Sequence, residues 1–177
     1  MKSAQIIQVD DSSKNPLRLI AKPVAKAEFG TTQLKEIITQ MQKALSKEAD
    51  GVAIAAPQIG VSLRIFAISP SAYEMGTKFM PLVFINPVIT KRSKKTAVMQ
   101  EGCLSVRWIY GKTKRAIAAT VEAYDIDGNK FTYGGQGLLA HIFQHEIDHL
   151  DGVLFIDHGF DLEEYTEEEV KASLTKK

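Results

Sequence analysis

The chain has 177 residues, of which 45% are hydrophobic and 24% charged, and its formal net charge is +1. These values are ordinary for a single globular domain and exclude a disordered, collagenous or membrane-bundle chain. The near balance of charge gives no electrostatic reason to expect direct nucleic-acid or membrane binding. The single cysteine, Cys103, excludes an internal disulfide. Because the N-terminal residues have neither secretory nor transit character, we expect a cytoplasmic protein.

The first predicted element is a helix. Apolar residues recur at helical spacing over 34–45, Thr32 can serve as the N-cap, and the glycine of Asp50-Gly51 suits the chain reversal at the end. After a loop or strand at 51–60, the apolar runs at 63–68 and 82–89 predict two further strands.

The second half predicts a hairpin and a buried helix. Apolar residues alternate over 117–123, and Asp127-Gly128 then separates them from a second strand at 130–133. Residues 136–150 carry apolar side chains nearly all round, which indicates a buried central helix.

A short terminal helix follows, which Thr166 and Glu169 begin with a capping box. We therefore predict an α+β fold with antiparallel or mixed β-sheets packed around one buried central helix, an N-terminal helix and a short C-terminal helix.

The central helix contains the most informative motif, His145-Glu146-Ile147-Asp148-His149. Helical positions i and i+4 lie about 40° apart and one turn along the axis, so both imidazoles can reach one divalent ion beside Glu146. A chance match is disfavoured because an unpaired charge on a buried helix is costly. The motif predicts a metal site with a carboxylate that carries protons.

A catalytic ion of this kind needs a third protein ligand, and the residues leave Cys103, His158 or a carboxylate open. His141 is excluded, because positions 141 and 149 are about 12 Å apart along a helix and the bonds are about 2 Å. Gly102 favours Cys103, since it permits a backbone bend that would expose the thiol. A lone cysteine is, however, more often a small buried side chain.

Three motifs resemble those of peptide deformylases. Residues 144–152 match the signature Q-H-E-x-D-H-L-x-G and residues 101–105 match E-G-C-L-S, both at every fixed position, while residues 51–58 resemble G-x-G-x-A-A-x-Q. The resemblance extends over about 16–157. It implies a single catalytic domain over 1–177, with that core and a helical tail at about 158–177. It also implies a hydrolase that removes the N-formyl group from the formylmethionine of new polypeptides and releases formate.

The resemblance implies a ligand set as well. Cys103, His145 and His149 would hold one divalent ion with water in the fourth position. Fe(II) is the expected metal, with Ni, Co or Zn as substitutes, because a thiolate and two imidazoles accept all four. Glu146 would take a proton from that water and deliver it to the departing amine.

Further residues are implied to contact the substrate. The Gln58 side chain and the Leu104 backbone N–H match the donors to the oxyanion. Leu138 and His141, which precede His145 by about one or two turns, are expected to border a slot for the methionine side chain. Val52 and Ile54 are implied to pair with the peptide backbone. Glu101 and Arg115 are implied to form a structural ion pair. Val52, Ile54 and Leu138 are equally compatible with a role in the core alone.

Two departures from the family pattern bear on turnover. Ala53 stands where the family has glycine and would add a methyl group beside the formyl site, so we include it among the substrate-binding residues. Val106-Arg107-Trp108 replaces the family's x-Pro-Gly and would bring two bulky side chains to the cleft mouth. We expect an altered peptide preference or lower turnover with metal binding kept.

Two alternative functions remain open. A deformylase-like protein could bind formylated chains without efficient turnover, for which Ala53 and Arg107-Trp108 are the support. A zinc metallopeptidase would share H-E-x-x-H, but the full match around Cys103 disfavours it. The expected partner is a formylmethionyl peptide or nascent chain, without direct nucleic-acid or membrane binding. Residues 161–177 hold six acids and three lysines and so give no electrostatic support for a basic ribosome-docking tail, although transient ribosome contact is left open.

Overall fold

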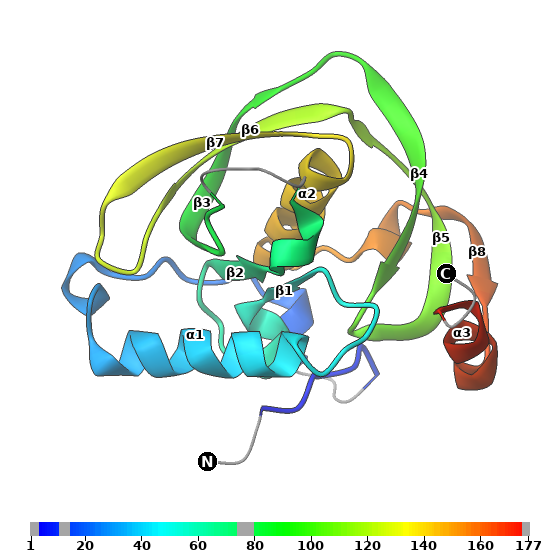
Figure 1. Cartoon of the computed structure of the whole chain (residues 1–177), viewed down its shortest axis with the longest axis horizontal. Helices are drawn as coiled ribbons and strands as arrows, with labels where there is room; N and C mark the ends of the chain where they lie inside the picture. The colour runs from blue at the N-terminus through cyan, green and yellow to red at the C-terminus, as the bar shows by residue number, and fades with distance from the viewer. Residues whose placement is uncertain (1–3, 11–14, 74–79, 175–177) are drawn as a thin grey trace.

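The computed structural model describes residues 4–10, 15–73 and 80–174 (Figure 1). A five-stranded antiparallel sheet has the strand order β1-β2-β3-β6-β7, and a three-stranded antiparallel sheet has the order β4-β5-β8. The helices are α1 (Thr32–Leu45), α2 (Leu138–Leu150) and α3 (Glu167–Leu174), with short 3-10 helices η1 (Pro16–Arg18), η2 (Lys26–Glu28), η3 (Ala56–Ile59), η4 (Pro70–Ala72) and η5 (Phe155–Asp157). The strands are β1 (Ala53–Ala55), β2 (Ile65–Ile68), β3 (Val83–Arg92), β4 (Thr96–Cys103), β5 (Val106–Ala116), β6 (Ala118–Tyr124), β7 (Lys130–Gln136) and β8 (Phe160–Glu164).

Two helices cover opposite faces of the five-stranded sheet. On one face Phe66 and Phe84 stack with ring centroids 4.5 Å apart and pack with Phe143 of α2. On the other face Ile65 packs in a cluster with Met41 of α1. Because β1 and β2 are covered on both faces, their sequences are continuously apolar rather than alternating.

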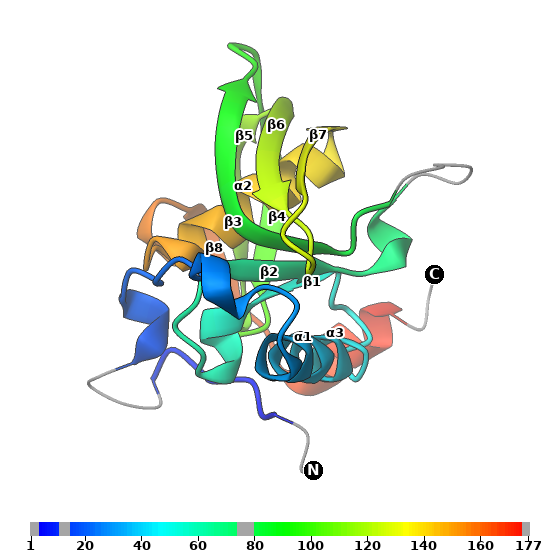
Figure 2. The ribbon, with the colours of Figure 1, turned by 90° about the vertical axis from the view of Figure 1, so that its left-hand side faces the viewer.

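The sheet bends sharply along β3, which runs beside β2 and then turns upward beside β6 (Figure 2). The bend lies at Asn86, whose φ of 50° is tolerated better by asparagine than by most residues. Its amide side chain accepts from the Val24 backbone N–H at 2.8 Å and donates to the Val24 carbonyl at 2.9 Å. Asn86-Pro87 thus interrupts the pairing of β3 with β6, which shifts register between Ile85 and Val88.

The central helix α2 lies between the two sheets (Figure 1). Toward the three-stranded sheet its contacts are polar. Gln144 accepts from the Ala116 backbone N–H at 3.1 Å and donates to the Ala116 carbonyl at 3.0 Å, and Asp148 pairs with Arg115 at 2.7 Å. The predicted α+β arrangement around one buried helix is therefore present.

The ends of α1 differ from the prediction. Thr31 is the N-cap, with its hydroxyl accepting from the Leu34 backbone N–H at 3.3 Å, whereas Thr32 is the first helical residue. The helix ends at Leu45 and not near Asp50-Gly51, because Leu45 is the last residue at helical spacing that packs into the core. The chain after it turns away from the helix axis and brings Glu48 to Arg107.

Other predicted elements lie close to their expected positions. Ala119, Val121 and Ala123 are buried on one face of β6, and the hairpin to β7 is formed, although Ile117 precedes the strand. The capping box of α3 is present, with Glu169 accepting from the Thr166 backbone N–H at 2.7 Å. No helix in the described ranges is long and apolar enough to cross a membrane.

Candidate active site

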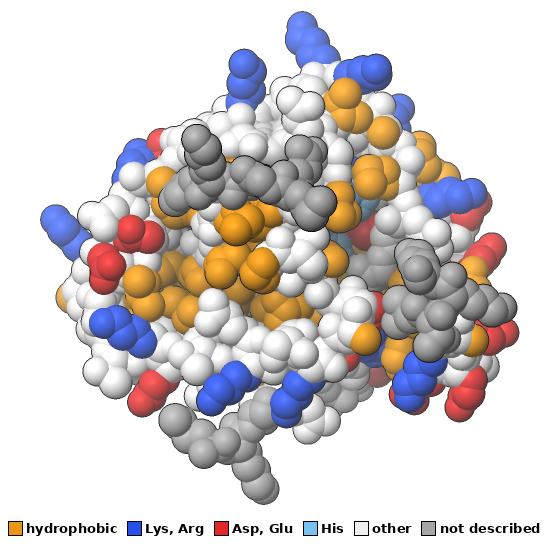
Figure 3. Space-filling view, in the orientation of Figure 1, with side chains coloured by type: hydrophobic (Ala, Val, Ile, Leu, Met, Phe, Trp, Pro, Cys, Tyr) orange, Lys and Arg blue, Asp and Glu red, His pale blue; other side chains and the backbone are white. Residues whose placement is uncertain are grey.

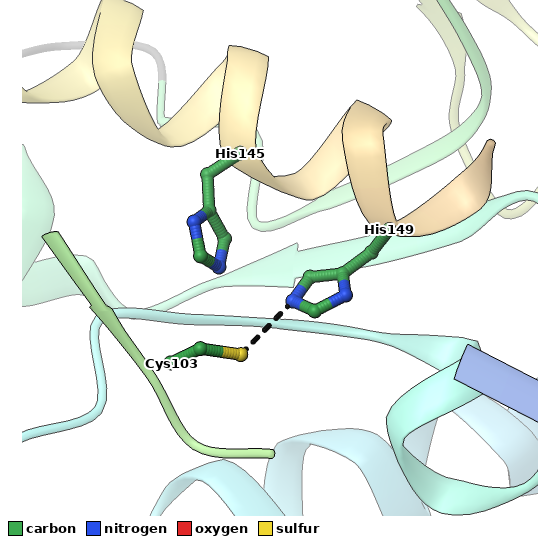
Figure 4. Close-up of side chains that lie close together, drawn as sticks. All are labelled: Cys103, His145 and His149. Carbon is green, nitrogen blue, oxygen red and sulfur yellow. Dashed lines mark hydrogen bonds between the residues drawn. The ribbon is translucent and has the colours of Figure 1, made fainter. Parts of the chain in front are cut away.

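The three side chains able to hold one ion come from two elements (Figure 4). Cys103 ends β4, and His145 and His149 occupy successive turns of α2. Their ligand atoms all lie within 4.8 Å of one another, and Cys103 Sγ is 3.1 Å from His149 Nε2. Because a thiolate and two imidazoles form a common tripodal ligand set, these residues fit a divalent metal.

Gly102 allows Cys103 to reach this position, for a reason that differs from the one predicted. Its φ is not positive, but a Cβ at Gly102 would lie 2.6 Å from the Tyr110 ring of β5. The strand pairing also shifts register between Gly102 and Cys103, which pairs with Val106. Close packing and this β-bulge direct the thiol to α2.

The electrostatics of the two imidazoles suit a bound cation. Burial and then His145 lower the pKa of His149 well below its usual value, so the ring is neutral and able to ligate. Burial also opposes charge on His145, but hydrogen bonds with Cys103 and Glu101 raise the pKa of this imidazole well above its usual value. Negative groups thus favour a positive charge at the convergence point of the three ligands.

Glu101 holds His145 in place from the far side of the ring. Its carboxylate is 2.5 Å from His145 Nδ1 and 2.5 Å from His141 Nε2. Because an ionised carboxylate only accepts, Nδ1 of His145 carries the proton and leaves the Nε2 lone pair for a metal. Arg115 donates to the same carboxylate at 2.7 and 2.8 Å, and the two residues form a buried ion pair.

The pKa of Glu101 reflects these contacts. Burial alone would raise it, but hydrogen bonds from Arg115, His141 and His145 lower the pKa far below the usual value. The carboxylate is therefore ionised at neutral pH.

Glu146 lies between the two histidines in the chain and lines the same cavity. Its side chain is buried, yet Oε2 has no hydrogen-bond partner. Burial raises the pKa of this carboxyl to about 7. A buried and unpartnered carboxylate oxygen at a metal-ligand cluster is available to exchange a proton with a bound water or substrate.

Gln58 and Leu104 form the wall opposite α2. Gln58 is buried, its Oε1 accepts from the Ala55 backbone N–H at 2.8 Å, and its Nε2 donates to Ser105 Oγ at 3.1 Å and toward Cys103 Sγ at 3.6 Å. The amide is thus fixed with its donor end toward the thiol. Leu104 follows Cys103 and lines the cavity.

These residues surround a cavity of about 200 Å³. Figure 3 shows a hollow right of centre, with histidine atoms inside it and apolar side chains along its border. Leu138, His141 and Ile142 of α2 line one part, and Val52 and Ala53 at the edge strand β1 line another. Leu138 and Val52 are partly exposed, whereas His141 and Ala53 are buried.

Two of the side chains considered from the sequence do not line the cavity. The Ile54 side chain is fully buried in the cluster with α1 and does not line the cavity, because alternate residues of β1 face opposite sides of the sheet. His158 is 3.5 Å from Asp148 and is not part of the ligand cluster. His141 lines the cavity and contacts Glu101, and it is not part of the ligand cluster, in agreement with its exclusion as a ligand.

Sequence reasoning missed Thr113, which donates to Glu101 through its hydroxyl. Thr113 precedes Arg115 by two residues and therefore shares its face of β5, which was the available signal. It also missed that Arg107 pairs with Glu48 and Asp50, residues from a distant segment of the chain.

Comparisons with known proteins agree with this geometry. The family model described as polypeptide deformylase matches residues 3–165. Peptide deformylase 2 of Clostridium acetobutylicum is 40% identical over 150 residues, which are 85% of this chain and 93% of that protein.

Solved structures are similar over most of the chain. The peptide deformylase of Thermotoga maritima has a TM-score of 0.76 and 35% identity, covering 89% of this chain and 98% of that one. A class I type b peptide deformylase from Acinetobacter baumannii bound to Met-Ala-Ser has a TM-score of 0.74 and 31% identity, covering 87% of this chain and 99% of that one. With its ligand cluster and all three motifs in place, the chain belongs to the polypeptide deformylase family.

Proposed function

We propose that this cavity hydrolyses the formyl group from the N-terminal formylmethionine of newly made polypeptides and releases formate. The chain is accordingly a metal-dependent hydrolase of the peptide deformylase class. The observation that carries the assignment is the convergence of Cys103, His145 and His149 beside the unpartnered oxygen of Glu146. The Met-Ala-Ser bound to the Acinetobacter baumannii relative supports a peptide of that kind as the ligand.

Cys103, His145 and His149 would hold the ion, which we propose to be Fe(II), with Ni, Co or Zn able to replace it. When bound, a divalent ion supplies Lewis acidity toward water and the formyl carbonyl. Glu101 orients the His145 ring for this role through its contact with Nδ1.

Glu146 is the proposed proton carrier. Its free Oε2 accepts the proton that the attacking water loses as the carbon–oxygen bond forms, and later delivers it to the methionine nitrogen as the carbon–nitrogen bond breaks. The proton therefore remains within the cavity, where burial separates the carboxyl from bulk water.

We assign stabilisation of the oxyanion to hydrogen bonds from Gln58 and Leu104. The Gln58 amide is held by Ala55 and Ser105, so its donor is fixed before substrate binds. Together with the Leu104 backbone N–H it would donate to the oxygen that becomes negative as the water attacks. Loss of one such donor typically lowers turnover by about 10²–10³.

The remaining lining residues position the peptide. Leu138, His141 and Ile142 would enclose the methionine side chain, and Val52 and Ala53 would flank the peptide backbone along the edge of β1. We further propose that residues 1–177 form one catalytic domain that acts in the cytoplasm on nascent chains. A transient contact with the ribosome is part of this proposal.

The test is formate release from formyl-Met-Ala-Ser by protein loaded anaerobically with iron or nickel. We expect Glu146→Gln to keep the metal and to lose at least about 10²-fold in turnover, because the ligands remain but the proton carrier is gone. Glu122→Gln, which neutralises a half-exposed carboxylate on β6 that pairs with Lys130 away from the cavity, is the matched control. Tight peptide binding without turnover in the metal-loaded wild type would instead indicate a binding protein. Cleavage at internal peptide bonds would indicate a peptidase.

A further inference from the structure

We propose that Asp50 and Arg107, which line the cavity, together with Glu48, which pairs with Arg107 from behind, make the enzyme prefer formylated peptides with basic residues after methionine over those with acidic residues. We call these three residues the mouth cluster. The inference rests on the proposed function and deepens it by naming a substrate class.

The lining of the cavity can be divided into a part near the formyl group, a slot for methionine and a remaining part that contains residues of the mouth cluster. The formyl group must lie near Cys103 and Glu146, and the methionine slot is formed by residues of α2. Asp50, Arg107, Trp108 and Tyr110 are among the residues that line the remaining part. The residues that follow methionine must therefore pass these side chains on their way out of the cavity.

The mouth cluster joins the loop before β1 to the start of β5. The Arg107 guanidinium donates to both oxygens of Asp50, at 2.9 and 3.2 Å, and to Glu48 at 2.5 Å. It also lies 4.8 Å from the centre of the Trp108 ring, within the range of a cation–π contact. These contacts fix the guanidinium in one orientation, so its charge is already engaged before a peptide enters.

The charge balance of the mouth cluster is negative, because two carboxylates face one guanidinium. Among the described residues that line the cavity, Arg107 is the only lysine or arginine. Tyr110 adds no charge of its own, since burial and Asp50 raise the pKa of its hydroxyl, which donates to Asp50 at 3.4 Å. An acidic peptide side chain thus meets carboxylates and a guanidinium that is already paired.

The surface next to the mouth is also negatively charged. Strand β8 pairs with β5 opposite Tyr110, and the Tyr165 backbone N–H donates to the Trp108 carbonyl at 3.0 Å. Acidic side chains gather over β8 and α3 on the right of Figure 3. A peptide that leaves the mouth therefore passes along an acidic side of the molecule, which favours basic residues through long-range attraction.

The experiment compares kcat/KM for matched amidated peptides. The neutral reference is formyl-Met-Ala-Ser, and the test pairs carry lysine or glutamate in place of alanine or serine. For the metal-loaded wild type we expect lysine to be preferred over glutamate by about 3–10-fold at low salt, and the ratio to fall toward one at high salt because the charges are partly exposed.

Two substitutions must move this ratio in opposite directions. Asp50→Asn removes a negative charge, so we expect the preference for lysine to fall to about one. Arg107→Met leaves both carboxylates uncompensated, so we expect the preference to rise above that of the wild type. Glu122→Gln, an equal change of charge on β6, is the control and should leave the ratio unchanged.

Binding of the deformylated products gives a second readout that does not depend on turnover. Met-Lys-Ser and Met-Glu-Ser amides should follow the same order of affinity in each protein. Equal kcat/KM for lysine and glutamate peptides in the wild type would overturn the inference while leaving the proposed function intact. Shifts of the same sign in Asp50→Asn and Arg107→Met would also overturn it, since they would indicate altered structure. Absence of turnover even with formyl-Met-Ala-Ser would overturn both proposals.

Discussion

Glu101 has more polar contacts than any other acid near the ligand cluster, and it explains how that cluster is held. Its carboxylate accepts from Arg115, His141, His145 and Thr113. A buried carboxylate without such donors would be protonated or excluded from the interior. Here the donors arrive from β5 and α2, so one side chain joins both elements behind the metal site.

Replacing Glu101 should therefore affect both stability and metal binding. Glu101→Gln keeps the shape but replaces one acceptor oxygen with a donor, which leaves Arg115 buried without its full partner. We expect the free energy of unfolding to fall by about 3–5 kcal/mol, and metal affinity to fall about 10–100-fold because His145 is no longer oriented. Urea denaturation of metal-free protein and a metal titration measure the two effects.

A double variant distinguishes the contribution of the Glu101–Arg115 ion pair from that of the other hydrogen bonds to Glu101. Glu101→Gln with Arg115→Met removes both charges, so its stability loss should be smaller than the sum of the two single losses. A loss below about 0.5 kcal/mol for Glu101→Gln alone, the range typical of surface substitutions, would contradict the role given to this carboxylate.

The residues of the site could be predicted unevenly from the sequence. His145, Glu146 and His149 could be predicted because a helix fixes their relative positions. Gly102 favoured Cys103 over His158, but only the resemblance assigned Cys103 as a ligand, since no local rule brings the end of β4 to α2. The partnership of Arg107 with Asp50, 57 positions apart, had no local signal.

Among the elements, those with a clear apolar pattern were predicted, whereas strand β4, which lacks such a pattern, was not. Helix α2 was evident from apolar residues all round, and α1 from one apolar face. Strand β4 contains one buried residue, Glu101, so its sequence shows no apolar face. It is stabilised by its register with β5, a pairing that residue patterns along β4 do not encode.

The β6–β7 hairpin provides a prediction for a single element. Its loop is organised by Asp125, whose carboxylate accepts from the backbone N–H groups of Asp127 at 3.0 Å and Asn129 at 2.8 Å, and from the Asn129 side chain at 2.9 Å. We expect Asp125→Ala to lower the free energy of unfolding by about 1 kcal/mol, and Asp125→Asn to lose less because an acceptor oxygen remains.

The effect of Asp125 should depend on pH. Although burial would slightly raise the pKa of this carboxyl, hydrogen bonds from Asn129, Asp127 and Gly128 lower it below the usual value. A lowered pKa means that the stabilisation is present above the usual aspartate pKa and is lost as pH falls through the lowered value. Unfolding curves of wild type and Asp125→Ala should thus converge on acidification, and a constant difference down to about pH 2 would contradict this assignment.

At the scale of the whole molecule, the two sheets are joined to α2 in different ways. The five-stranded sheet packs on α2 through apolar contacts among Phe66, Phe84 and Phe143. The three-stranded sheet contacts α2 through Glu101, Arg115 and the ligand cluster. The ion would therefore link the three-stranded sheet to the rest of the protein, in addition to its chemical role.

Removing the metal should weaken that link more than the core. At a metal concentration a thousand times Kd, binding to the folded state alone stabilises it by about 4 kcal/mol, so chelation should lower Tm by about 8–16 °C for a chain of this length. Cys103→Ser is the control and should show a much smaller change on chelation, since it lacks the thiolate. In hydrogen exchange, β4 and β5 should lose protection in the metal-free protein. Strands β2 and β3 should keep their protection, because the apolar contacts of these two strands with α1 and α2 are unaffected. Equal loss of protection in both sheets would show instead that the ion stabilises the fold as one cooperative unit.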